Sequence, residues 1–520
     1  MKEAERAPRV PAEMADRCRR PGLLATGIVS IMSLGGCMVG PDFSTPETEV
    51  NDTWVETAEF GVKRDAAVDE QWWRGFNDPV LTRLVDEAYA NNLDLRTAGV
   101  RVLQAMAQRG VAMGEFWPQS QTINGSATRS RASDNFAPEG GPTPPPSNYW
   151  NTYSTGFYAS WELDFFGKFR RNIEAANAEL DATLAGYDDV MVSLIAEVAS
   201  TYVGIRTLET QLAIVRGNIA AQERAVFLTQ EKFDAGATTM LDVTQARARL
   251  AQTQGDLAGL EARRRNTVFR LCTLLGRPPS LLEDVLGESG DIPDVGGDIG
   301  VGVPAELLRR RPDIRVAERT AAAQSALIGV EKASLYPSFS LNGSIGLQSN
   351  DTNRLWRSDS RIGDLGLGFS WPFLNYGRID NSIRAQDAAF QQAALSYQNT
   401  VLNAAQEVES GLASVSGARQ QVEKLAEAVA NSRLSLELSL EQYREGETDY
   451  TRVIQAQQTL LQVESTHAEA RGNVASSLIA TYKALGGGWE MRDGLKDLVP
   501  EDIRDEMRER TDWGDYLDAM

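Results

Sequence analysis

The stretch WELDFFGK at residues 161–168 returns as WPFLNYGR at residues 371–378, 210 positions further along the chain. The correspondence continues without a gap, so that Gly236 returns as Gly446. Solenoid repeats recur roughly every 20 to 50 residues, so a period of this length indicates a duplicated half of a domain. The sequence therefore predicts one elongated unit built twice, with pseudo-symmetry inside a single subunit.

Each copy of this stretch leads into a long segment without proline, from residue 168 to 234 and from residue 378 to 445. A helix of about 68 residues would be about 100 Å long, and it needs a packing partner along its length. Apolar residues recur every seven positions in both segments, which favours a left-handed coiled coil over an isolated amphipathic helix. They are Met191, Val198, Ile205, Leu212, Ile219, Val226 and Phe233, and then Val401, Val408, Val415, Val422, Val429, Leu436 and Tyr443. The row three residues further on is mixed and is interrupted by the polar Gln222.

Both long helices are expected to end at matched glycine turns, at 234–238 and 444–448. Glycine suits the position after a helix, and threonine or aspartate can cap the helix that follows. The return helices are shorter than their partners, so helices predicted at 79–115 and 313–334 should stack on them end to end. These two helices match at an offset of 219, which indicates a nine-residue deletion in the second strand segment.

Residues of alternating polarity mark four candidate strands, at 119–130, 155–161, 339–347 and 365–373. Segments of about ten residues with this alternation and aromatic flanks are typical of membrane β-barrels, although a strand on a soluble core shows the same pattern. Four strands are too few to close a barrel, which takes about eight, and open sheet edges cannot lie in lipid. We therefore expect several subunits to contribute to one barrel.

Residues 1–36 are interpreted as a lipoprotein signal peptide. Basic residues precede a short apolar run at 23–34, and Gly35-Gly36-Cys37 follows, which is the layout of an export signal. The run of about 12 residues is too short to span a bilayer, which takes about 20. The cysteine after two glycines resembles a bacterial lipoprotein box, in which Cys37 would be acylated, and no cofactor is expected beyond this covalent lipid. A chance cysteine behind an ordinary signal peptide is the alternative, and Met14 is an alternative start to Met1.

Composition argues against several classes of function. A formal charge of −20 and a pI near 4.7 disfavour a nucleic-acid partner, which requires a basic surface. Cys272 has no disulfide partner if Cys18 and Cys37 belong to the signal region, and His467 is the single histidine. Metal sites and His-dependent catalysis are therefore unsupported, and the chain has no cofactor-binding loop or nucleophile constellation. We expect no enzyme activity, no cofactor and no metal.

Several segments together resemble the TolC-like outer-membrane efflux protein family, in its branch of RND-type efflux lipoproteins. They are CMVGPDF at 37–43, WW and FNDP within 72–79, WELDFFG at 161–167, LLRRRPDI at 307–314, PFLNYGR at 372–378 and KALGGGW at 483–489. The resemblance implies an α+β fold in a homotrimer. Four strands per subunit would form one 12-stranded transmembrane β-barrel, continuous with a long periplasmic coiled-coil helical barrel.

On this resemblance, the chain divides into two structural repeats, 37–276 and 277–486, each with a helix, two strands and a long helical hairpin. The acidic tail 487–520 would join the equatorial region or be disordered. Met38 follows the cysteine. By resemblance to lipoprotein sorting in Gram-negative bacteria, the absence of aspartate at this position favours the outer membrane. The protein would be lipid-anchored there and extend into the periplasm.

The function implied by the resemblance is that of an exit duct in a tripartite efflux pump, passively exporting drugs or other small molecules. Its implied partners are a periplasmic membrane-fusion adaptor and an inner-membrane RND-type transporter. A type I protein-secretion exit channel is one alternative. A lipid-anchored coiled-coil scaffold without a pore is another.

The resemblance also assigns roles at the two glycine turns. Adaptor hairpins would dock at Gly236, Thr238, Gly446 and Thr448. Candidates for the closed periplasmic gate are Asp242, Tyr443, Asp449, Arg452 and Gln455, for which ordinary solvated helix surface is the alternative. Family members often carry aspartates at the positions of Arg452 and Gln455, so an aspartate ring is not expected unless Asp449 supplies it. Three copies of Arg452 would repel one another unless paired with Asp242 or Asp449.

Overall fold

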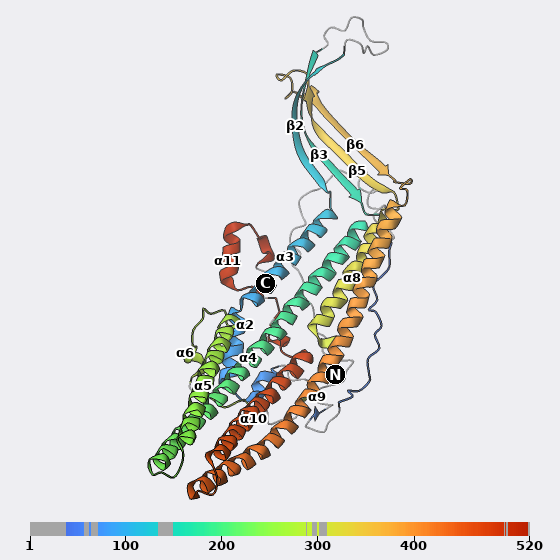
Figure 1. Ribbon diagram of the computed structural model, residues 1–520. Helices are drawn as coiled ribbons and strands as arrows, with labels where there is room; N and C mark the ends of the chain where they lie inside the picture. The colour runs from blue at the N-terminus through green and yellow to red at the C-terminus, as the bar shows by residue number, and fades with distance from the viewer. Residues whose placement is uncertain are drawn as a thin grey trace, which may run out of the picture.

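The chain forms a long, narrow unit with a sheet at one end and two helical hairpins at the other (Figure 1). The computed structural model describes residues 38–56, 62–63, 71–133, 149–287, 289–293, 299–300, 309–492, 494–495 and 498–517. Cys37 and the predicted signal peptide at residues 1–36 lie outside the described residues. The α+β architecture predicted from the sequence is confirmed.

Two long helices, α4 (Lys168–Asp234) and α9 (Arg378–Glu445), span 67 and 68 residues, as the proline-free segments predicted. Each is followed by a return helix of 35 residues, α5 (Met240–Leu274) and α10 (Tyr450–Ala484). The seven-residue pattern is well buried near the middle of the molecule. At its end Phe233 of the first copy is exposed, whereas Tyr443 of the second copy is buried. The two copies of the seam therefore differ at the hairpin turns.

The helix predicted ahead of the first strand is broken in two, α2 (Pro79–Asn91) and α3 (Leu93–Glu115). Asn92 causes the break, because its side-chain oxygen accepts the backbone N–H of Leu95 at 2.9 Å and caps α3. Its amide group also donates to the carbonyl of Leu274 at 2.9 Å, which holds the joint against the end of α5. The prediction of one continuous helix was wrong at this residue.

The matching helix of the second copy, α8 (Pro312–Ala333), is continuous and packs against both α4 and α9. The N-terminal segment 38–56 runs extended along α8 and α9. The hydroxyl of Thr45 donates to Glu318 of α8 at 2.7 Å. Glu409 of α9 accepts two backbone N–H groups from the end of the segment, at 2.7 and 3.0 Å. Side chains of both helices thus hold the segment in place.

The four predicted strands form one antiparallel sheet in the order β2-β3-β5-β6. They are β2 (Ser120–Arg131), β3 (Tyr149–Leu163), β5 (Ser338–Ser349) and β6 (Arg361–Ser370). The two copies meet where β3 pairs with β5, which leaves β2 and β6 as the edges of the sheet. A two-residue parallel pair, β1 (Val62–Lys63) with β4 (Ile299–Gly300), was not anticipated from the sequence.

The two faces of the four-stranded sheet differ in chemistry. Ile123, Phe157 and Ile345 stand in one cross-strand row on the apolar face, and all three side chains are exposed. On the opposite face polar side chains bond across strands, as Ser160 does with Asn342 at 2.7 Å. An exposed apolar face backed by a polar face is the organisation of a barrel wall between lipid and water.

A matched pair of tryptophans joins the sheet to the helices. The indole N–H of Trp161 donates to the carbonyl of Phe116 at 3.1 Å, just after α3 ends. The indole N–H of Trp371 donates to the carbonyl of Leu335 at 2.9 Å, just after α8 ends. The glycines that precede α4 and α9 adopt φ of 81° and 78°, a region that favours glycine. The stretch that reveals the duplication is therefore the joint between strand and long helix in both copies.

The largest apolar core lies where the short helices and the tail surround α4. Trp72 is fully buried there and stacks on Tyr482 of α10, with ring centroids 5.5 Å apart and planes at 5°. The acidic tail, for which the sequence allowed either outcome, packs on this core and carries α11 (Glu501–Arg510) beside α3 (Figure 1). Gly99 permits this approach, because a Cβ there would lie 1.9 Å from the carbonyl oxygen of Leu498.

Candidate functional site

The two hairpin turns form the end of the molecule farthest from the sheet (Figure 1). Gly236 and Gly446 occupy these turns with φ of 69° and 79°, and nothing lies within 4 Å of a Cβ built on either. Both glycines are exposed, while Thr238 and Thr448 are half-buried. The predicted docking residues thus sit on two open, matching turns. Their role in binding an adaptor stays a prediction.

Beside the turns, four helices share a small apolar cluster, here called the tip cluster. Its buried members are Ala225 of α4, Ala246 of α5, Tyr443 of α9, and Tyr450 and Val453 of α10. The rings of Tyr443 and Tyr450 lie 5.3 Å apart, and these residues are 4% and 2% exposed. Tyr443, a predicted gate residue, therefore packs inside the subunit. Any influence it has on a gate must act through the packing of the tips.

Burial also raises the pKa values of the two tyrosines in the tip cluster. Burial, the neighbouring Tyr443 and the carboxylate of Asp242 together raise the pKa of Tyr450 to about 12. Burial likewise raises the pKa of Tyr443. Both phenols are therefore neutral at pH 7. Asp242, the gate candidate of the first hairpin, is half-buried and accepts a hydrogen bond from the hydroxyl of Thr238 within its own turn.

Lys232 connects the two hairpins, and sequence reasoning missed it. Its Nζ donates to the carbonyl of Tyr443 at 2.7 Å and to that of Arg444 at 2.9 Å, and it lies 4.8 Å from the centroid of the Tyr443 ring. A cation at a helix C-terminus satisfies free carbonyls and interacts favourably with the helix dipole. The repeat offered one signal, because the position matching Lys232 in the second copy is the uncharged Gln442.

The remaining gate candidates lie at the start of α10. Asp449 is the N-cap of this helix, and its carboxylate accepts the backbone N–H of Arg452 at 3.3 Å. Arg452 and Gln455 are exposed and line a shallow groove between α9 and α10. Within the described part of the chain, the guanidinium of Arg452 pairs with neither Asp242 nor Asp449. A gating role for these residues stays a prediction.

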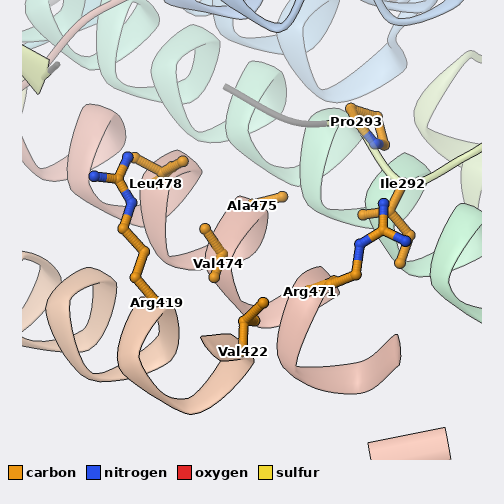
Figure 2. A pocket seen from close by; sticks show the side chains of 8 residues that line it. All are labelled: Ile292, Pro293, Arg419, Val422, Arg471, Val474, Ala475 and Leu478. Carbon is orange, nitrogen blue, oxygen red and sulfur yellow. The ribbon is translucent and has the colours of Figure 1, made fainter. Parts of the chain in front are cut away.

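A small cavity lies between α9 and α10 nearer the middle of the molecule, where Ile292 and Pro293 cover it (Figure 2). Its volume of about 180 Å³ is below the roughly 300 to 1,000 Å³ of most ligand pockets. Arg471 at its edge is paired with Asp291 at 3.1 Å. Across the residues that the structure describes, no group of three or more His, Cys, Asp or Glu side chains could hold a metal ion.

Comparison with known proteins identifies relatives along almost the whole chain. The sequence profile of the outer membrane efflux protein family matches residues 84–277 and 303–487. Nodulation protein T of Rhizobium leguminosarum bv. trifolii is 32% identical over 461 residues, which cover 88% of this chain and 95% of that protein. The solvent efflux pump outer membrane protein SrpC of Pseudomonas putida is 30% identical over 468 residues, covering 89% and 97%.

The fold is shared as well. The solved structure of the outer-membrane channel OprN matches with a TM-score of 0.79 and 32% identity, covering 87% of this chain and 100% of that one. The two segments matched by the family profile begin 219 residues apart and end 210 apart, the same offsets that relate the two copies. The chain therefore belongs to the outer membrane efflux protein family and is a TolC-like channel component of the outer membrane.

Proposed function

We propose that the protein is a passive exit duct for drugs or other small molecules, supplied by an RND-type inner-membrane transporter through a periplasmic adaptor. The observation that carries this proposal is a sheet with an exposed apolar face, a polar face and two open edges, continuous with long helices. SrpC, which is similar over almost its whole length, is named as a component of a solvent efflux pump. That relative favours small-molecule export over protein secretion, and no catalytic step is required.

The open sheet edges support assembly from several copies. Channels of this family are trimers that work in tripartite pumps. Three sheets of this kind would pair the β2 edge of one subunit with the β6 edge of the next and form a 12-stranded barrel. Closure would satisfy the backbone groups of both edges, which lipid cannot do. The apolar row with Ile345 would then face lipid, and the polar row with Asn342 would face the lumen.

The position of the N-terminal segment supports lipidation at Cys37. Met38, the first described residue, packs against Gly167 at the joint of β3 and α4, where a Cβ on the glycine would lie 2.8 Å from the Met38 side chain. The buried guanidinium of Arg171 fixes the next residues, donating to the carbonyl of Val39 at 3.2 Å and to Asp42 at 2.8 Å. Met38 therefore lies beside the rim of the sheet, where a barrel of such sheets would meet the periplasmic leaflet. An acyl chain on the preceding cysteine would anchor the segment in that leaflet.

Export is tested in cells that lack the gene and accumulate a fluorescent apolar dye. The chain should restore dye export, and the purified trimer should conduct ions across a planar bilayer. Ile345→Asp should abolish both, because it places a charge on the lipid face. Asn342→Asp places the same charge on the opposite face of the same strand and should retain both. Secretion of a protein without restored export of the dye would favour the type I alternative. A trimer without conductance would favour the scaffold.

Lipidation is tested separately with Cys37→Ser. The variant should no longer incorporate labelled palmitate, while the trimer still assembles, because the sheet and helices do not depend on the anchor. Cys272→Ser serves as the matched control and should still incorporate palmitate, because Cys272 is buried in the core and should not be acylated. Palmitate that still enters the Cys37→Ser protein would refute this site.

A further inference from the structure

The charged side chains of the four-stranded sheet are divided between its two faces by sign. Those within β2, β3, β5 and β6 are Arg129, Arg131, Glu162, Arg361 and Asp364. Side chains alternate between the faces along a strand, so the register places the arginines on the apolar face with Ile345. Both acids fall on the polar face, where Asp364 accepts a hydrogen bond from Ser344. Within the strands, the apolar face therefore carries positive charge alone.

The three arginines lie at the same end of the sheet, the end farthest from the helices (Figure 1). Arg131 is the last residue of β2, and Arg361 is the first residue of β6. All three side chains are exposed. The turn between β5 and β6 adds no net charge, because it holds Arg354 and Arg357 against Asp351 and Asp359. We call Arg129, Arg131 and Arg361 the arginine cluster.

The opposite end of the apolar face has a different chemistry. Its residues within the strands include Trp161, Phe339 and Phe369, and none of the residues at that end of this face is charged. Aromatic side chains are typical of both interfaces of a membrane barrel, whereas the arginines here are confined to one. The two ends of the face therefore present different groups to the two leaflets.

One aromatic ring holds two of the arginines in place. Tyr149, the first residue of β3, is paired with Arg131 across the strands, and it is 50% exposed. The guanidinium carbons of Arg129 and Arg131 lie 5.4 and 5.5 Å from the centroid of its ring, within reach of a cation–π contact. Two like charges beside one ring repel each other, and an anion that contacts both offsets this repulsion. The ring thus holds both groups ready for one anion.

The surroundings of the arginine cluster indicate an anion that carries apolar chains. Arginine binds phosphate oxygens through two parallel N–H···O bonds, which favours it wherever phosphate is recognised. Further along the same face, Ile123, Leu365 and Leu367 are exposed and available to acyl chains. A charge on the lipid face of a barrel is costly at the middle of the bilayer and cheap near its surface. The arginine cluster therefore suits the level of the lipid headgroups.

We propose that the arginine cluster binds the phosphate-bearing headgroup of a lipid in the outer leaflet. The inference rests on the proposed barrel, in which the β2 edge of one subunit pairs with the β6 edge of the next. Arg129 and Arg131 of one subunit then share a junction with Arg361 of its neighbour. A lipid bound at this junction contacts two subunits, so it holds the subunits together as well as anchoring the barrel at its outer end.

The test measures binding of lipid A, a phosphorylated glycolipid, to the purified trimer in detergent by native mass spectrometry. The double variant Arg129→Gln, Arg131→Gln should bind lipid A roughly thirtyfold more weakly, because each arginine near a membrane surface gives about a fivefold preference for an anionic lipid. Arg361→Gln should weaken binding about fivefold. The matched control is Arg263→Gln, Arg265→Gln, which removes two exposed arginines at the same spacing from α5 and should bind like the wild type.

Each outcome decides for or against the site. Wild-type binding by the double variant at the β2 edge would overturn it, and wild-type binding by Arg361→Gln would overturn the junction between subunits. Equal binding of lipid A stripped of its phosphates would contradict recognition of the headgroup. Displacement of lipid A by millimolar inorganic phosphate would show a site for free anions and not for a lipid. A wild-type trimer that conducts without binding lipid A defeats this inference alone, whereas a trimer without conductance counts against the channel itself.

Discussion

The two hairpin tips have the same backbone conformation but different side chains. Both turns place an exposed glycine in the left-handed region, and both are followed by a return helix of the same length. Only the second tip buries two tyrosines, and only the first supplies a lysine that reaches across to the other hairpin. Positions that agree in the two copies therefore build the scaffold. Positions that differ are where one hairpin can act on the other.

The largest effect is expected at a position of the tips that is buried in one copy and exposed in the other. Tyr450→Ala removes a buried ring from the tip cluster and should destabilise it by about 3 to 5 kcal/mol. The matching residue of the first tip is Met240, which is exposed, so Met240→Ala should change stability by no more than about 0.5 kcal/mol. Hydrogen exchange of the backbone amides at the start of α10 and α5 measures both. Equal exchange in the two variants would mean that the tips are energetically alike.

A smaller effect is expected from the contact between the tips. Lys232→Met removes the cation that caps α9, which should cost about 1 to 2 kcal/mol and make openings of the periplasmic end more frequent. Gln442→Met changes the matching residue of the second copy, which is exposed, and should leave the opening frequency unchanged. The opening frequency in planar bilayers compares the two. Lys232→Arg retains the charge and should restore most of the wild-type behaviour, whereas a loss equal to that of Lys232→Met would contradict the capping role.

Much of the fold could be predicted because the same sequence pattern occurs twice in the chain. The paired tryptophans and glycines mark the joints, and the seven-residue pattern and the missing prolines mark the long helices. The break at Asn92 was missed because a helix cap is a local hydrogen bond, and its donor at Leu95 looks like any residue of a continuous helix. Local patterns in the sequence do not separate a capping asparagine from a solvated one.

The site was harder to predict than the fold. The contact of Lys232 with Tyr443 joins residues 211 positions apart, and it depends on which hairpins pack together. Tyr443 was placed both in the seven-residue seam and among the gate candidates, and only the packing of Tyr450 against it shows that it is buried. Sequence comparison of the copies did locate the unequal positions. It could not show which residues the side chains at these positions contact.

The smallest effect on stability, and the most direct test of a gate, comes from the pair in which the copies carry opposite charges. Arg452 corresponds to Asp242. Of these two side chains, only that of Asp242 is bonded within its own turn, where it accepts a hydrogen bond from Thr238. Arg452→Ala removes an exposed side chain, so the free energy of unfolding should change by about 0.5 kcal/mol or less. If three copies of Arg452 narrow the closed end, single-channel conductance should nevertheless rise, because a charge and its bulk leave the passage. Gln455→Ala, one turn further along the same exposed groove, separates the loss of charge from the loss of volume. An unchanged open level in Arg452→Ala would remove this residue from the gate and leave the asymmetry of the tips to the buried tyrosines and Lys232.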